Sequence, residues 1–142
     1  LEFGFRGDGV GSTRPALAFP RQGRRNLLEG PAGVYDTDVG QWHHWATVYD
    51  TTTETASMYR DGELVSRAFW KVEFKGTGQL HVGRRVGARP GAPGEGALMG
   101  AIDEVRVWSV AVSQRALAYY SLHANAAVLW NHPDRGGLVL YR

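Results

Sequence analysis

The chain has no cysteine and no long apolar run, and both absences narrow the classes of protein to which it can belong. Without cysteine no disulfide braces the fold, but 142 residues are enough for one domain with a sizeable core. No apolar stretch approaches the roughly 20 residues that span a bilayer, so we expect no membrane insertion. The chain starts at Leu1 and shows no apolar secretory leader, which predicts a single module, residues 1–142, excised from a larger protein.

Lysine is scarce as well, because Lys71 and Lys75 are the only two among 16 basic residues. The formal net charge is only +2, although the pI is about 9.2. The arginines are spread along the chain, apart from small groups at 21–25 and 84–89. A nucleic-acid-binding protein normally presents one continuous basic face, so we expect no nucleic-acid partner.

The most informative segment is residues 42–62, WHHWATVYDTTTETASMYRDG. Residues 42–49 alternate between two sets of side chains, which is the pattern of a β-strand with two different faces. Turn-forming residues follow, a second strand is predicted over 56–60, and Asp61-Gly62 is a type I′ hairpin dipeptide before a third strand at 63–69. The sequence therefore predicts a three-stranded antiparallel meander, with Trp42 on its inward face.

The rest of the chain reads as short strands separated by glycine and proline turns, with one helix. We expect a loop over 21–33 whose Leu27-Leu28 tucks inward, and further strands or apolar runs at 1–6, 16–19, 34–39, 80–82, 98–108, 128–130 and 138–141. Ser113 is a good helix N-cap, and Val112 with Leu117 forms a hydrophobic staple. Leu117, Tyr120 and Ala124 lie on one face of that helix. This spacing favours an antiparallel sandwich.

Five sequence blocks also carry a family resemblance: Trp-x-His-x-Ala at 42–46, Tyr49-Asp50, Tyr-x-Asp-Gly at 59–62, Gly-x-Leu-x-Val-Gly at 78–83, and GAIDEVRVW at 100–108. In this order they resemble the laminin G-like branch of the concanavalin A-like lectin superfamily, from Leu1 to about His123. The resemblance implies an all-β fold, an antiparallel two-sheet jelly-roll sandwich with one short helix. In that family, strands usually precede the position of Leu1, so they are either missing here or supplied by another segment.

The function implied by the resemblance is non-catalytic binding or adhesion in an extracellular or cell-surface protein. The partners would be a glycan or an extracellular protein, together with neighbouring domains of the same polypeptide. Two alternatives stay open. One is an architectural or assembly module with no ligand of its own, and the other is an accessory domain of a carbohydrate-active enzyme.

An enzyme of this superfamily would need paired carboxylates. Laminarinase-type hydrolases share the sandwich, and a retaining mechanism requires two carboxyl groups about 5 Å apart in one cleft. Asp103 and Glu104 are consecutive, so on a strand they point to opposite faces, and the family implies a structural role for them. His43 and His44 face apart for the same reason, and we expect His44 to be a hydrogen-bonded core residue. We therefore expect no catalysis.

Sugar binding requires aromatic faces and hydrogen-bonding groups that converge in a shallow site, usually on loops. The predicted ligand-binding residues are Tyr59, Trp70, Arg84, Arg85 and Arg89, with Trp45 as a weaker candidate. Trp70 is the best platform because it follows a strand in a polar setting, although packing under a loop explains it equally well. Trp42 and Trp108 are assigned to the core.

Calcium is the one cofactor that the resemblance implies, bound at the sandwich rim through oxygen ligands. Asp36, Asp38, Asp50 and Asp103 are available, but the alternative that the first three are turn residues is slightly favoured. Arg6-Gly7-Asp8 matches the integrin-recognition tripeptide. In a chain so rich in arginine and glycine, chance is the better explanation.

Overall fold

The structure, a computed structural model, describes residues 2–7, 13–21, 24–31, 40–71, 81–82, 100–123 and 137–141. Its elements are β1 (Glu2–Gly7), β2 (Thr13–Arg21), β3 (Arg24–Glu29), β4 (Trp45–Asp50), β5 (Thr55–Arg60), β6 (Glu63–Phe69), β7 (Arg106–Trp108), α1 (Gln114–Leu122) and β8 (Leu138–Tyr141). All pairings between these strands are antiparallel. The prediction of a β-rich fold with one short helix is confirmed, although the described strands form three separate sheets.

Strands β4, β5 and β6 form the predicted meander, in that order. Asp61 and Gly62 connect β5 to β6 with φ angles of 52° and 82°, the two positive values that a type I′ turn requires. The first strand, however, begins at Trp45 and not at Trp42. The backbone of His44 is bonded to the turn, because the Asp61 N–H donates a hydrogen bond to the His44 carbonyl at 2.8 Å.

Strands β1, β2 and β3 form a second meander at the N-terminus. The loop predicted over 21–33 is wrong in part, because Arg24–Glu29 is a strand. That strand returns along β2 and pairs Leu28 with Leu17, so its backbone partners come from a neighbouring strand that local sequence could not indicate. The inward position of Leu28 is confirmed, since this side chain is buried.

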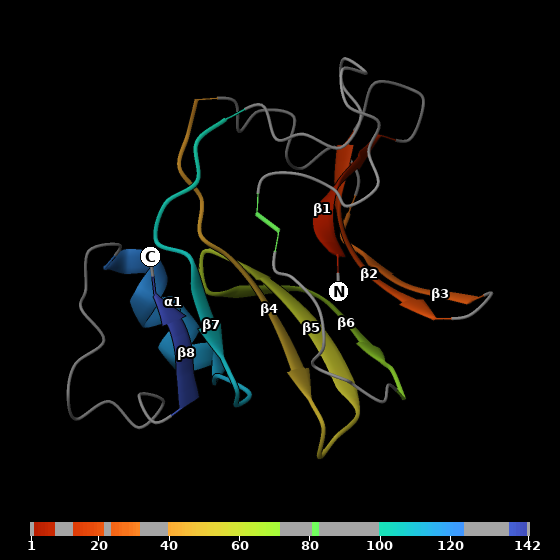
Figure 1. The fold of residues 1–142 in the computed structure, drawn as a ribbon. Helices are drawn as coiled ribbons and strands as arrows, with labels where there is room; N and C mark the ends of the chain where they lie inside the picture. Colours follow the sequence, from red (N-terminus) through yellow and green to blue (C-terminus); the bar gives the residue numbers. More distant parts are fainter. Residues whose placement is uncertain are drawn as a thin grey trace.

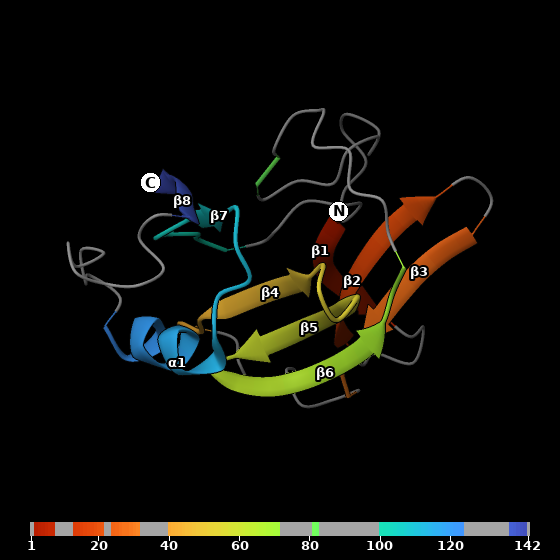
Figure 2. The same ribbon diagram turned by 90° about the horizontal axis from the view of Figure 1, so that it is seen from below.

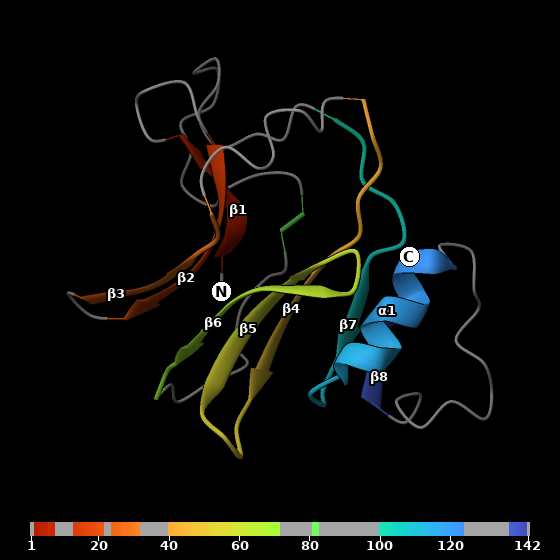
Figure 3. The ribbon, with the colours of Figure 1, turned by 180° about the vertical axis from the view of Figure 1, so that it is seen from behind.

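The central strand β5 is buried on both faces and so joins two cores. Ala56 and Met58 pack with Leu17, Leu28 and Trp70, which places the N-terminal sheet against one face of the meander. Figures 1 and 3 show this sheet on one side and the helix on the other. The opposite core contains Tyr59, Val112, Ala116, Leu117 and Tyr120. The packing of the N-terminal sheet on the meander, sheet face against sheet face, is the arrangement of a β-sandwich.

Helix α1 confirms the capping prediction. The Ser113 hydroxyl accepts a hydrogen bond from the Ala116 N–H at 3.3 Å, and Val112, Leu117 and Tyr120 are buried. The helix lies beside the β5–β6 turn (Figure 2). Gln114 Nε2 donates a hydrogen bond to the Gly62 carbonyl at 3.3 Å. The helix therefore fixes the turn from one side of the meander. Ala124 lies outside the described residues.

Strands β7 and β8 form a small third sheet. Of the strand expected over 98–108, residues 98 and 99 lie outside the described residues, residues 100–105 are not in a strand, and Arg106–Trp108 is confirmed. Glu104 has a φ of 56°, which interrupts the extended backbone before β7. The run at 138–141 is a strand, and it pairs with β7. His81 and Val82 are not in a strand, while the predictions at 34–39 and 128–130 lie outside the described residues. Of the helices in the described ranges, none is long and apolar enough to cross a bilayer.

Candidate functional site

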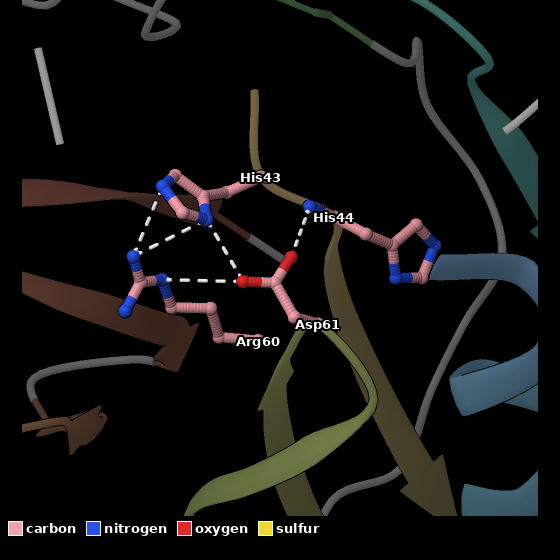
Figure 4. Close-up of polar contacts among 4 residues, drawn as sticks. All are labelled: His43, His44, Arg60 and Asp61. Atoms are coloured by element: carbon pink, nitrogen blue, oxygen red, sulfur yellow. Dashed lines mark hydrogen bonds and ion pairs between the residues drawn. The ribbon is translucent and has the colours of Figure 1, made fainter. Parts of the chain in front are cut away.

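A polar cluster of His43, Arg60 and Asp61 lies where the chain enters β4 beside the β5–β6 turn (Figure 4). We call these three residues the hairpin cluster. His43 Nδ1 is 2.8 Å from Asp61 Oδ2, and Arg60 Nη2 is 3.0 Å from His43 Nε2. Arg60 Nε lies 3.7 Å from the same Asp61 oxygen. The three side chains thus form a closed set of contacts around one carboxylate.

His43 contacts both other residues of the cluster through its ring nitrogens. A carboxylate can only accept, so Nδ1 must carry the proton and donate to Asp61. The Arg60 Nη2 lies near both ring nitrogens, 3.0 Å from Nε2 and 3.2 Å from Nδ1. The imidazole is therefore held between the Asp61 carboxylate and the Arg60 guanidinium.

Asp61 also holds the backbone of the preceding segment. Its Oδ1 accepts a hydrogen bond from the His44 N–H at 2.9 Å, while its own N–H donates to the His44 carbonyl at 2.8 Å. Its positive φ is one that aspartate tolerates better than most residues. The side chain of Asp61 is 46% exposed, whereas that of His43 is 17% exposed. The cluster is therefore rigid and still open to solvent at its carboxylate.

His44 points away from the cluster, toward the helix side of the meander (Figure 4). The prediction that the two histidines face apart is thus confirmed, as is the inward position of His44. Burial, followed by the positive charge of Arg106, lowers the pKa of His44, and Asp61 opposes this shift. The predicted hydrogen bond is absent at Nδ1, which is buried without a partner. Neutral His44 is the form that this environment favours.

Trp42 is 69% exposed, so its assignment to the core is wrong. The alternation of the segment predicts faces only within a strand, and Trp42 lies three residues before β4 begins. Sequence reasoning therefore overlooked Trp42, and it also missed Arg60 and Asp61 because their partner His43 is 17 or 18 residues away in the chain. The type I′ turn dipeptide was the one signal that could have drawn attention to Asp61.

Two predicted ligand-binding residues are buried and cannot offer a surface. Trp70 is 6% exposed and packs in the core against the N-terminal sheet, which corrects its role as a solvent-facing platform. Tyr59 is 4% exposed, and its hydroxyl accepts a hydrogen bond from Arg67 Nη2 at 3.2 Å. Trp45 packs partly buried at the same core as Trp70, and Trp108 is half-buried beside the helix core, as predicted. The predicted residues Arg84, Arg85 and Arg89 lie outside the described residues.

Asp103 and Glu104 each serve a local structural contact. Asp103 Oδ1 accepts from the Glu104 N–H at 2.8 Å, and Glu104 Oε2 pairs with Arg106 Nη2 at 2.6 Å. The Arg106 side chain is only 3% exposed, and its guanidinium lies 5.0 Å from the centre of the Tyr120 ring. These contacts fit the structural interpretation of the Asp-Glu pair: Asp103 accepts from the neighbouring backbone, and Glu104 holds the β7 residue Arg106, which lies over the Tyr120 ring of the helix.

Of the three aspartates for which a turn role was favoured, the structure describes Asp50, which lies where the chain turns between β4 and β5. Asp50 Oδ1 accepts from the Thr52 N–H at 2.8 Å, and such hydrogen bonds lower the pKa of Asp50. Across the ranges that the structure describes, no group of three or more metal-ligating side chains comes together. Asp36 and Asp38 lie outside those ranges, as does Asp8 of the Arg-Gly-Asp tripeptide.

Comparison with known proteins gives two matches. The profile of the concanavalin A-like lectin/glucanases superfamily, in its laminin G form, matches residues 2–118. A solved structure of an S-layer domain-containing protein, residues 221–444, from Clostridium thermocellum ATCC 27405 has a TM-score of 0.50 and 17% identity. The match covers 84% of this chain and 55% of that one, so this chain spans about half of its structural relative. No curated protein sequence matches the chain significantly.

Proposed function

Because this chain belongs to the concanavalin A-like lectin/glucanases superfamily, we propose that it is a non-catalytic binding module of an extracellular or cell-surface protein. Its ligand is a glycan or a protein, and neighbouring domains of the same polypeptide flank it. The observation that carries this proposal is the local engagement of Asp103 and Glu104 in a superfamily that includes both lectins and glucanases.

The chemistry of that carboxylate pair argues for binding over hydrolysis. A retaining glycosidase needs one carboxyl as nucleophile and a second as acid, both directed at the same bond. Here Glu104 is neutralised by the buried Arg106, and Asp103 caps the neighbouring backbone N–H. Both carboxylates are thus occupied by contacts within residues 103–106. These contacts support the proposal that the chain binds its ligand without hydrolysing it.

The surface location draws support from the structural relative. That protein carries an S-layer domain by its title, and it shares the fold of this chain at low identity. A module that spans about half of such a chain fits a role within a longer surface polypeptide. The ligand itself does not transfer from this comparison, because fold does not determine function.

An assembly module is the second candidate, and one observation favours it. Val110 is 50% exposed and Val139 is 67% exposed, both at the β7–β8 sheet, where Val110 also borders Gly137. Exposed apolar side chains beside a short sheet edge suit contact with another domain. Light scattering over a concentration series distinguishes the two: concentration-dependent association lost in Val139→Ser supports assembly.

A glycan array, screened with and without calcium, tests the binding function directly. We expect retention of particular glycans, and calcium dependence would place a metal in the site. We also predict that incubation with laminarin and related β-glucans releases no reducing ends. Turnover that disappears in Asp103→Asn would show that the chain is an enzyme and would overturn the proposal.

A further inference from the structure

The β5–β6 turn contains one of the two Asp-Gly dipeptides in the sequence, Asp61-Gly62, and the other is Asp8-Gly9. Asp-Gly is the dipeptide at which aspartate isomerises most readily, because glycine has no side chain to shield its backbone nitrogen. That nitrogen can attack the side-chain carboxyl carbon of the preceding aspartate. The turn therefore holds both reacting groups of a spontaneous modification.

The reaction requires only water. The Gly62 nitrogen bonds to Asp61 Cγ and loses its proton, and one carboxyl oxygen leaves as water, which gives a five-membered succinimide. Water then opens this ring at either of its two carbonyl carbons. Opening at Cγ restores aspartate, whereas opening at the backbone carbonyl gives isoaspartate, in which the chain runs through the side chain and is one carbon longer.

Contacts of the Asp61 carboxylate oppose the first step. Its Oδ1 accepts a hydrogen bond from the His44 N–H at 2.9 Å, and its Oδ2 lies 2.8 Å from His43 Nδ1. Figure 4 shows the carboxylate directed toward these two residues, on the segment that enters β4. Ring closure moves Cγ toward the Gly62 nitrogen, so it works against both contacts.

The backbone of the turn opposes the same step. A type I′ turn places the Gly62 nitrogen roughly opposite the Asp61 Cβ about the Cα–C bond, so the peptide between them must rotate before the ring can close. Helix α1 restrains this rotation, because Gln114 Nε2 donates to the Gly62 carbonyl at 3.3 Å. The helix backbone is also close, since a Cβ added to Gly62 would lie 2.4 Å from Ala118 Cα.

We infer that Asp61-Gly62 is a latent isomerisation site, which helix α1 and the contacts of the hairpin cluster keep in the aspartate form. Loosening either restraint admits ring closure. Isoaspartate would lengthen the two-residue turn by one backbone carbon, and the type I′ geometry that sets the register of β5 and β6 would be lost. This inference is independent of the ligand of the module.

The test measures isoaspartate after several weeks at neutral pH, in native buffer and in urea. Trypsin cleaves after Arg60 and Arg67 and releases the peptide 61–67, in which electron-transfer fragmentation distinguishes isoaspartate from aspartate. In urea, Asp61 and Asp8 should convert at similar rates because they share the same following residue. In native buffer, Asp61 should convert about tenfold more slowly than in urea, which corresponds to an opening free energy of about 1.4 kcal/mol.

Two variants loosen the restraints separately. Gln114→Ala removes the helix contact with Gly62 and keeps a strong helix former, and His43→Ala removes the contact with Oδ2. Both should convert at Asp61 faster than the parent protein in native buffer. Arg115→Ala is the matched control, because Arg115 is an exposed neighbour on the same helix, and it should convert at the parent rate. Far-ultraviolet circular dichroism confirms that each variant is folded, and the comparison of native buffer with urea requires no variant.

Three outcomes would overturn the inference. Equal conversion of Asp61 in native buffer and in urea would show that the fold gives no protection. Conversion at the parent rate in folded Gln114→Ala and folded His43→Ala would show that neither contact restrains the turn. Absence of isoaspartate at position 61 in urea, where Asp8 converts, would show that the dipeptide in the turn is not reactive.

Discussion

Replacing Trp70 by alanine should destabilise the protein strongly, while replacing Trp42 should not. Trp70 is 6% exposed and packs with Leu17, Leu28, Ala56 and Met58 where the N-terminal sheet meets the meander. Its backbone also takes part in two hydrogen bonds, from the Tyr49 hydroxyl at 2.9 Å and to the Glu54 carbonyl at 2.7 Å. These are main-chain contacts that alanine can keep, so the loss comes from the ring.

The size of the effect follows from the area that the ring buries. A tryptophan buries roughly 200 Å² on folding, which at about 25 cal/mol per Å² is worth about 5 kcal/mol. Alanine recovers part of this, but the vacated volume leaves a cavity between two sheets, and core Trp→Ala changes cost about 3–5 kcal/mol. Trp42 is 69% exposed, so Trp42→Ala should change the free energy of unfolding by about 0.5 kcal/mol or less.

Urea unfolding followed by far-ultraviolet circular dichroism measures the free energy of unfolding of both variants without relying on tryptophan fluorescence, and thermal melting followed in the same way gives their Tm. At this chain length about 1 kcal/mol corresponds to roughly 4 °C in Tm, so Trp70→Ala should melt about 10–20 °C below the parent protein. The Tm of Trp70→Phe should lie between those of the parent protein and Trp70→Ala, because the phenyl ring fills part of the cavity. A larger loss for Trp42→Ala than for Trp70→Ala would refute the placement of the two rings.

Two further predictions concern pH and the turn. Burial and Arg106 lower the pKa of His44 below its ordinary 6.5, so the unfolded chain takes up that proton more readily and stability falls as pH drops below about 6.5. His44→Gln should reduce the difference in Tm between pH 8 and pH 5.5, whereas His81→Gln, at an exposed position, should leave this difference unchanged. An equal pH dependence of Tm in the two variants would contradict the burial of His44. Gly62 has a φ of +82° and its added Cβ would overlap the backbone of Ala118, while Gly40 has the same φ with open space around it. Gly40→Ala should therefore lower the free energy of unfolding by about 1–2 kcal/mol through backbone strain. Gly62→Ala should lower it clearly more because of the added overlap, and the urea midpoints of the two variants measure the difference.

The elements that depend on local signals could be predicted from the sequence alone. The I′ turn at Asp61-Gly62 follows from the low cost of positive φ at these two residue types. The capping contact of Ser113 and the buried positions of Leu117 and Tyr120 follow from spacing within one helical segment. The family, too, was recognisable from five short blocks and is confirmed over residues 2–118.

Contacts between distant segments could not be predicted in this way. Strand Arg24–Glu29 exists because β2 provides its hydrogen-bonding partners, and its own sequence resembles a polar loop. The burial of Arg106 likewise depends on a distant segment, since its guanidinium lies 5.0 Å from the centre of the Tyr120 ring in the helix. Propensity alone gives no information about such partners.

Trp42 and Trp70 show most clearly the difference between what the local sequence predicts and what tertiary contacts decide. The sequence by itself determined that aromatic residues stand at both ends of a three-stranded meander, because period and turn chemistry are local properties. Only the tertiary structure decided which ring is buried. Packing of the N-terminal sheet covers Trp70, whereas the hydrogen bonds of Asp61 to His44 hold the chain outside the strand at Trp42 and leave that ring in solvent. Burial depends on which surfaces meet, and that is set by segments far away in the chain.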